Sequence, residues 1–238
     1  MTAQQLLFWM DVETDSLDVR DCTVLEWAGF MTTGDLHVIM GSEFHYLADM
    51  TPEMVRMTRD FADPIVQEMH DKSGLWDALL GKTEAGLDRL SPELVDARLA
   101  SLVHWAGNLT HLANFMHEGE STSVIRPPEG WPKKPRFAGS GVAAYDVQIV
   151  RMQQYPKLAA SLDYTACDVS NVRRFLTDQC GIDIIKNPER PHRADEDILN
   201  AWKEAIIVQA SVQYAYQQAE VYASTADFPM PTFVGPEF

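Results

Sequence analysis

An apolar run near the N-terminus that ends in two carboxylates sets the strongest limit on how this chain folds. Residues 6–10 are Leu, Leu, Phe, Trp and Met, and Asp11, Val12 and Glu13 follow them. This run predicts a buried strand over residues 5–14. Alternate residues of a strand point to the same face, so Asp11 and Glu13 should project together. Burying two charges among such neighbours is costly, which favours a functional role over ordinary strand-end charges.

Three further polar residues lie far along the chain. Asp146 follows a glycine-containing segment, 137–141, and falls in the first turn of an expected helix. His192 and Asp197 lie five residues apart, and Pro191 suggests that His192 precedes the helix that carries Asp197. Taken singly, the aspartates fit charges favoured near a helix N-terminus, and the histidine fits a surface residue.

Together these five side chains suit the cleavage of a phosphodiester bond. Hard carboxylate oxygens are typical ligands of Mg²⁺ or Mn²⁺. Two such ions about 4 Å apart hold both the attacking and the leaving oxygen of an in-line displacement. A loop histidine, with an ordinary pKa near 6.5, suits the role of general base.

The composition narrows the class of protein. The chain has 238 residues, 46% of them hydrophobic, which is enough for one sizeable core or for one core plus an appendage. No apolar run approaches the roughly 20 residues of a membrane span, and the N-terminus does not resemble an export signal. Cys22, Cys167 and Cys180 are widely spaced, which favours a reducing cytoplasm over a disulfide framework or zinc cluster.

The net charge of −16 argues against broad electrostatic binding of long nucleic acid. It is compatible with a short nucleic-acid substrate held mainly by metal ions, and equally with an acidic, solvated surface that has no such role.

The pattern of elements predicts a mixed α/β sheet with helices on its faces. The expected strands are 5–14, 23–32 and 36–44, which form a meander, followed by 136–138 and 164–167. The expected helices are 51–80 with breaks at Pro64 and Gly74, 94–116, 143–154, one from Ser170 capped by Asp168 or Ser170, and 194–217. We expect one domain over 1–223, a proline-rich loop at 125–136, and a loosely structured tail at 224–238.

The order Asp-x-Glu, central Asp and His-x-x-x-x-Asp resembles the DEDDh family of 3′-to-5′ exonucleases, and within it the oligoribonucleases. Segments 9–17, 24–28, 69–75, 164–170 and 192–198 carry the likeness, which covers residues 6–76 and 136–212. A tyrosine four residues before the last aspartate would mark the alternative version of the superfamily. Arg193 stands there, so the histidine version fits.

The resemblance implies a ribonuclease H-like sheet with helices on both faces and two divalent ions held by four carboxylates. The implied metal ligands are Asp11, Glu13, Asp146 and Asp197, with His192 as general base. It also implies a homodimer in which the partner helps to close the site. The extra material at about 77–135, expected to be mainly helix and loop, is absent from compact family members.

Five further residues match substrate-binding positions of the family. In the family a leucine and a partner-subunit tyrosine wedge against the bases, and Leu17 and Tyr164 match these; a core leucine and a strand aromatic are the plain alternatives. His70 matches a pocket histidine, with a helix-end surface residue as the alternative. Ser140 and Ser170 match positions that cap the 5′ phosphate.

Three departures from the family pattern bear on specificity. Thr165 replaces an expected arginine, and Ile65 an expected aromatic. Arg174 replaces a threonine four residues after Ser170, on the same helix face, where it would restore the missing guanidinium unless it is simply a surface arginine. Thr165 and Arg174 together count as the first departure, Ile65 as the second and the insertion as the third. Together they leave dinucleotide specificity open.

The leading hypothesis is a metal-dependent 3′-to-5′ exonuclease that converts short single-stranded RNA to 5′-mononucleotides. The same metal core would serve a proofreading-like exonuclease on single-stranded DNA. A non-catalytic binding module is the third interpretation, although a decayed enzyme would be expected to have lost at least one of the five residues.

Overall fold

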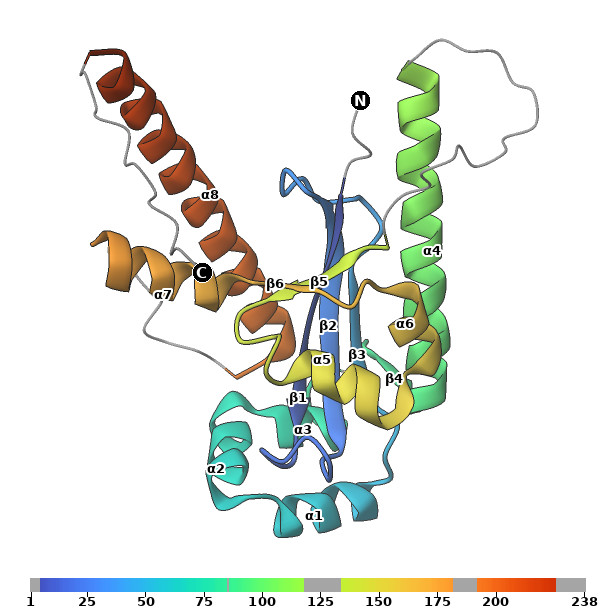
Figure 1. Ribbon diagram of the computed structural model, residues 1–238. Helices are drawn as coiled ribbons and strands as arrows, with labels where there is room; N and C mark the ends of the chain where they lie inside the picture. The colour runs from blue at the N-terminus through green and yellow to red at the C-terminus, as the bar shows by residue number, and fades with distance from the viewer. Residues whose placement is uncertain (1–4, 85, 118–133, 182–191, 226–238) are drawn as a thin grey trace, which may run out of the picture.

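The computed structural model describes residues 5–84, 86–117, 134–181 and 192–225. Within these ranges one six-stranded sheet has the order β4-β3-β2-β1-β5-β6 (Figure 1). The strands are β1 (Leu6–Thr14), β2 (Val24–Thr33), β3 (Phe44–Ala48), β4 (Asp88–Leu90), β5 (Arg136–Gly139) and β6 (Ala166–Asp168). β1, β2 and β3 pair antiparallel, whereas β4, β5 and β6 join their neighbours in parallel. The expected mixed sheet with its opening meander is therefore confirmed.

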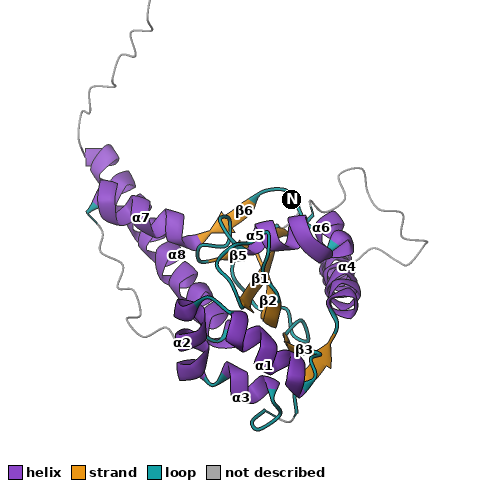
Figure 2. Ribbon diagram, turned by 90° about the horizontal axis from the view of Figure 1, so that it is seen from below, coloured by secondary structure: helices purple, strands orange, loops and turns teal. Residues whose placement is uncertain are grey.

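Helices cover both faces of the sheet (Figures 1 and 2). They are α1 (Pro52–Phe61), α2 (Pro64–Ser73), α3 (Leu75–Leu79), α4 (Pro92–His117), α5 (Asp146–Ile149), α6 (Pro156–Ser161), α7 (Val169–Cys180) and α8 (Ala194–Thr225), and a π-helical turn, η1 (Val150–Gln154), follows α5. One apolar cluster joins the sheet to α1, α3, α4, α5 and α6. A second joins the other face to α7 and α8.

The two apolar clusters divide the side chains of β1 by parity. Phe8, Met10 and Val12 belong to the first cluster, and Leu7 and Trp9 belong to the second. Both faces of the strand are thus buried, which explains its unbroken apolar sequence. The same alternation turns the odd-numbered residues at the end of β1 toward α8.

Two local expectations differ from the structure. The strand expected at 36–44 is wrong, because β3 begins only at Phe44. Leu36 instead has a left-handed backbone, with φ of 65°, and its side chain packs into the second apolar cluster. The helical region 51–80 does divide as expected, since Pro64 begins α2 and Gly74, with φ of 76°, ends it.

The first part of the expected insertion is built into the domain. β4 extends the sheet edge beside β3, an addition that was not expected, and α4 buries Val95, Leu99 and Val103 in the main cluster. The carboxylate of Asp96 on α4 accepts the backbone N–H groups of Lys157 and Leu158 at 3.2 and 2.8 Å, which caps α6.

Parts of the sequence-based expectations lie outside the described residues. These are most of the loop at 125–136 and nearly all of the tail at 224–238. Among the described residues, no helix is long and apolar enough to cross a membrane.

Candidate active site

Three of the predicted carboxylates meet where the end of β1 faces the start of α8. Asp11 and Glu13 extend from β1, and Asp197 lies in the first turn of α8. One ligand oxygen from each lies within 4.8 Å of the other two. The structure thus brings together residues separated by more than three-quarters of the chain, in an arrangement that a divalent cation would fit.

The electrostatics of this cluster fit the same interpretation. Burial raises the pKa of Asp11 well above its ordinary range, and the neighbouring charges of Asp146 and Glu13 raise it further. The pKa of Glu13 is raised by burial and by Asp197. Carboxylates packed this closely resist ionisation unless a cation compensates them, so the donor set suits a hard divalent metal ion.

Asp146, the fourth predicted ligand, lies beside this group. It is not one of the three residues whose ligand oxygens lie within 4.8 Å of one another. It is the first residue of α5, and its Oδ1 accepts the backbone N–H of Val12 on β1 at 3.2 Å. Burial raises its pKa to about 7. Its charge acts on Asp11, which makes it part of the same acidic site.

His192 lies two residues before the start of α8, so it precedes that helix as Pro191 suggested. Its backbone is left-handed, with φ of 54°, which is uncommon for a residue other than glycine. His192 is partly exposed, and it lies near enough to His70 to add to the lowering of the His70 pKa that burial causes. A partly exposed histidine is suited to exchange protons with solvent.

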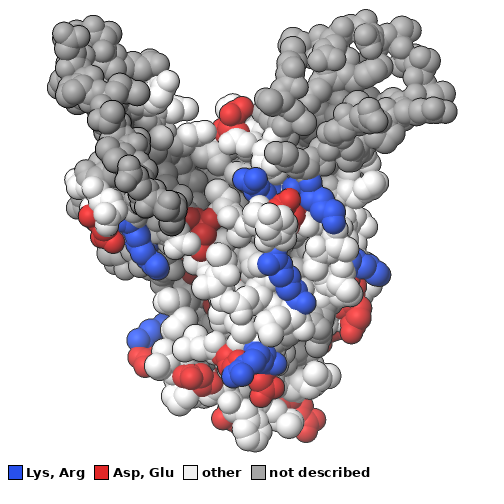
Figure 3. Space-filling view, in the orientation of Figure 1, with Lys and Arg blue, Asp and Glu red and all other residues white. Residues whose placement is uncertain are grey.

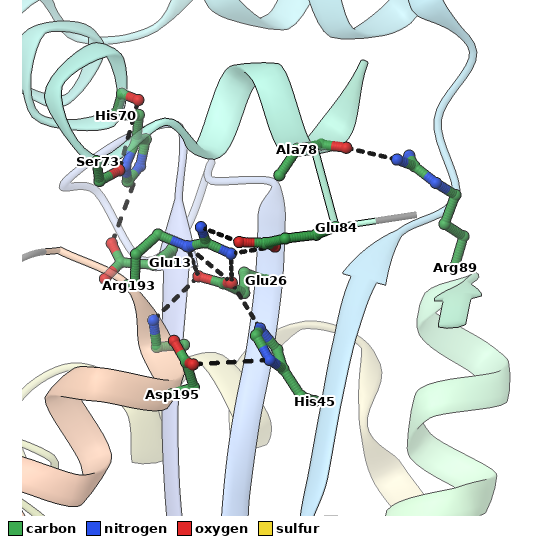
Figure 4. Close-up of polar contacts among 11 residues, drawn as sticks. Glu13, Glu26, His45, His70, Ser73, Ala78, Glu84, Arg89, Arg193 and Asp195 are labelled. Carbon is green, nitrogen blue, oxygen red and sulfur yellow. Dashed lines mark hydrogen bonds and ion pairs between the residues drawn. The ribbon is translucent and has the colours of Figure 1, made fainter. Parts of the chain in front are cut away.

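His70 is fully buried on the α2 side of Glu13. Its Nε2 lies 2.8 Å from the carbonyl oxygen of Thr14 and 3.9 Å from Oε2 of Glu13 (Figure 4). The ring packs edge-on against Trp76, and burial lowers its pKa. Its contacts in the structure are therefore with the site carboxylate and the end of β1.

The other predicted substrate residues have unequal exposure. Leu17, Tyr164 and Arg174 are exposed, and Ser140 is partly so. Ser170 is buried, and its hydroxyl donates to Oδ1 of Asp168 at 2.7 Å.

Asp168, considered in the sequence only as a helix cap, has a wider role in the structure. It caps α7 and also accepts the N–H groups of Gly141 and Ala143 at 3.0 and 3.2 Å. It therefore ties the loop that precedes Asp146 to the start of α7.

Sequence reasoning missed two residues that shape the site. The Tyr145 hydroxyl donates to the carbonyl oxygen of Ser16 at 2.5 Å and lies 2.6 Å from Oγ1 of Thr14, which holds the loop after β1. Glu26 lies directly opposite Glu13 in the β1–β2 register and is completely buried. Glu26 falls in a segment that carried the family likeness, but only its place opposite Glu13 would have singled it out.

The chain is similar in sequence to proteins named oligoribonuclease. No family model matches it. An oligoribonuclease of Corynebacterium efficiens is 28% identical over 200 residues, covering 83% of this chain and 75% of that protein. One of Corynebacterium diphtheriae is 25% identical over 201 residues, covering 83% and 79%.

Solved structures agree on the fold. Escherichia coli exonuclease I in complex with a dT13 oligonucleotide matches with a TM-score of 0.56 and 13% identity, over 90% of this chain and 43% of that one. Its complex with a 5cy-dT13 oligonucleotide matches with a TM-score of 0.55 and 12% identity, over 90% and 42%. The chain thus spans about two-fifths of exonuclease I. It shares the ribonuclease H-like fold of exonuclease I and is similar in sequence to oligoribonucleases.

Proposed function

We propose that this chain is a metal-dependent 3′-to-5′ exonuclease that converts short single-stranded oligoribonucleotides to 5′-mononucleotides. The observation that carries the proposal is the acidic cluster, in which oxygens of Asp11, Glu13 and Asp197 lie within 4.8 Å of one another. The oligoribonuclease relatives support RNA of short length. The fold it shares with exonuclease I supports the reaction class.

In this proposal Asp11, Glu13, Asp146 and Asp197 hold two Mg²⁺ or Mn²⁺ ions. Such ions, when bound, stabilise the charge that develops on the phosphate and on its attacking and leaving oxygens. His192 takes the proton from the attacking water, a role that suits a partly exposed imidazole. His70, buried beneath Glu13, holds that carboxylate and the end of β1 in place.

Exposed side chains supply the proposed contacts with substrate. Leu17 is 58% exposed and Tyr164 is 82% exposed, so both can reach bases, Leu17 by apolar packing and Tyr164 by stacking on a base held by the partner subunit. Ser140, Ser170 and Arg174 would contact the 5′ phosphate. Ser170 already donates both its hydroxyl and its backbone N–H to Asp168, so in its case a rotated hydroxyl would be used.

Basic residues on one face support contact with phosphates despite the negative net charge. Figure 3 shows Lys and Arg side chains over the middle of the face that carries β5 and α6, and acidic side chains mainly below them. Arg136 on β5 and Lys157 on α6 belong to these elements. Such residues position a backbone without reading its sequence.

A homodimer is part of the proposal. Exposed apolar side chains lie on α7 and α8, a surface that a second copy would cover. They are Val172, Phe175, Leu199, Ile206, Ile207 and Val212. Within the described residues neither Cys22 nor Cys167 forms a disulfide, which agrees with the reducing cytoplasm proposed as its location.

A length series of 5′-labelled strands tests the proposed function. RNA and DNA of matched sequence, from two nucleotides upward, are incubated with Mn²⁺ or with EDTA, and Asp11→Asn is compared with wild type. The proposal expects stepwise shortening from the 3′ end, fastest for the shortest RNA, and lost in EDTA and in the variant. Faster turnover of DNA would assign the activity to a deoxyribonuclease instead. Intact strands of both kinds in Mn²⁺ would refute the enzymatic proposal.

A further inference from the structure

A second polar cluster lies beside the carboxylate site, centred on the buried Glu26. Glu26 on β2 is the register partner of Glu13 on β1, so the two carboxylates share one face of the sheet (Figure 4). The side chain of Glu26 has no exposed surface, and a charge in such a place must be paired.

Both oxygens of Glu26 accept hydrogen bonds from the residues that link His192 to α8. Oε1 receives Nε and Nη2 of Arg193 at 3.0 and 2.6 Å. Oε2 receives the backbone N–H of Ala194, the first residue of α8, at 3.0 Å. His45 on β3 adds its Nε2 at 2.7 Å from Oε1. The carboxylate thus grips a side chain and a helix N-terminus at the same time.

This cluster is an anchor rather than a second metal centre. Glu26, His45 and Asp195 do offer ligand atoms within 4.8 Å of one another. The Arg193 guanidinium, however, already lies against the Glu26 carboxylate and supplies the positive charge. A divalent ion there would have to displace it.

We propose that Glu26 is a positioning residue that sets where His192 and Asp197 stand relative to Glu13. Its contacts, Arg193 and Ala194, lie between those two residues in the chain. The N–H of Asp197 in turn donates to the carbonyl oxygen of Arg193 at 2.9 Å, so the first turn of α8 is built on the anchored segment.

The backbone of His192 gives a second, independent sign that this segment is held in place. A left-handed conformation outside glycine costs on the order of 1 kcal/mol and persists only where the surroundings impose it. The hydrogen bonds from Arg193 and Ala194, the next two residues, to the Glu26 carboxylate can impose this conformation.

Glu84 provides a matched control. Its carboxylate also pairs with Arg193, through Nη1 and Nη2 at 2.6 Å each. Among the described residues, the N–H of Ala194 donates to Glu26 and not to Glu84. Glu84→Gln removes one negative charge from the guanidinium and leaves the helix anchor intact. Glu26→Gln cannot satisfy both anchors, because one of its two terminal atoms becomes an N–H donor facing another donor.

Amide hydrogen exchange in the metal-free protein tests the anchor. We expect peptides that span residues 192–198 to exchange at least about tenfold faster in Glu26→Gln than in wild type, and Glu84→Gln to change little. Equal exchange in the two variants would overturn the proposal. If Glu26→Gln does not fold, Arg193→Lys replaces it, because a lysine keeps the charge but loses the two-pronged contact. Wild-type exchange in that variant would equally overturn the proposal.

The catalytic consequence rests on the proposed function. With Mn²⁺ and a short RNA, Glu26→Gln should lower kcat about 10- to 100-fold, the usual effect of residues that orient metal ligands, with little change in KM. Glu84→Gln should keep kcat within a few-fold of wild type. A normal kcat in a folded Glu26→Gln protein would refute the positioning role. An inactive wild type would refute the proposed function alone, because the exchange measurement needs no activity.

Discussion

Replacing Asp146 by Asn should change how the stability of the metal-free protein depends on pH. The pKa of this buried carboxyl is raised from 3.8 to about 7, so the folded protein holds its proton more tightly than the unfolded chain does. The resulting stabilisation is complete below pH 3.8 and is lost as the pH rises toward 7. Asn keeps an oxygen that can accept the N–H of Val12 but has no proton to lose.

The size of the effect follows from that pKa. A tenfold change in proton affinity corresponds to about 1.4 kcal/mol, so the full rise corresponds to about 4 kcal/mol. Asp11 and Glu13 release protons over an overlapping pH range and share part of this loss. Near pH 8 we therefore expect Asp146→Asn to be more stable than wild type by roughly half of this free energy, about 2 kcal/mol. For a chain of this length that corresponds to a Tm about 4 to 8 °C higher.

The assay is thermal unfolding in EDTA between pH 5 and pH 8. The Tm of wild type should fall with pH relative to that of Asp146→Asn, and the gap should widen steadily. Asp178→Asn, a matched change on the exposed surface of α7, should follow wild type. Parallel curves for wild type and Asp146→Asn would refute the view that this carboxyl is held protonated by its surroundings.

Three further substitutions test other parts of the structure. His192→Ala should lower kcat about 10²- to 10⁴-fold while Mn²⁺ affinity, measured by calorimetry, stays the same; turnover at the wild-type rate would remove His192 from the role of base. Gly29→Ala would put a Cβ 2.0 Å from the carbonyl oxygen of Trp9, so β1 and β2 must separate, and we expect a loss of at least about 3 kcal/mol in urea unfolding. A loss below about 1 kcal/mol would contradict that close approach. Asp96→Ala removes the cap of α6 and should cost about 1 to 2 kcal/mol, whereas an unchanged urea midpoint would show that the cap contributes nothing.

The sequence predicted the elements whose signal is local. β1 was recognised because both of its faces are buried, and the same alternation predicted that Asp11 and Glu13 lie on one side. The breaks at Pro64 and Gly74 follow from the backbone chemistry of those two residues, and the structure has both. The positions of the metal-ligand candidates came from spacing and from the family likeness.

The predictions that were wrong or missing concern segments whose conformation is set by tertiary contacts. Residues 36–43 have the apolar content of a strand, but Leu36 adopts a left-handed turn so that its side chain reaches the core and its carbonyl oxygen accepts the indole N–H of Trp202 at 3.1 Å. β4 has only three residues, two of them charged, and is defined by its pairing with β3. The local sequence indicates neither the contact of Leu36 with Trp202 nor the pairing of β4 with β3.

The anchor at Glu26 shows the same limit within the site. A glutamate in an apolar strand signals a buried charge, but its partner Arg193 lies 167 residues away. A single sequence offers no means to pair them. The carboxylate cluster itself was predictable because its members carry a recognisable order, whereas the residues that hold it in place do not.

Counting the Mn²⁺ ions bound to each chain tests the central claim most directly. Calorimetric titration in the presence of a 5′-mononucleotide, the expected product, should give two ions per chain for wild type. Asp11→Asn should bind fewer, and Asp178→Asn should match wild type. A wild-type protein that binds no Mn²⁺, or that binds it equally well without the Asp11 carboxylate, would contradict a metal site built from Asp11, Glu13 and Asp197.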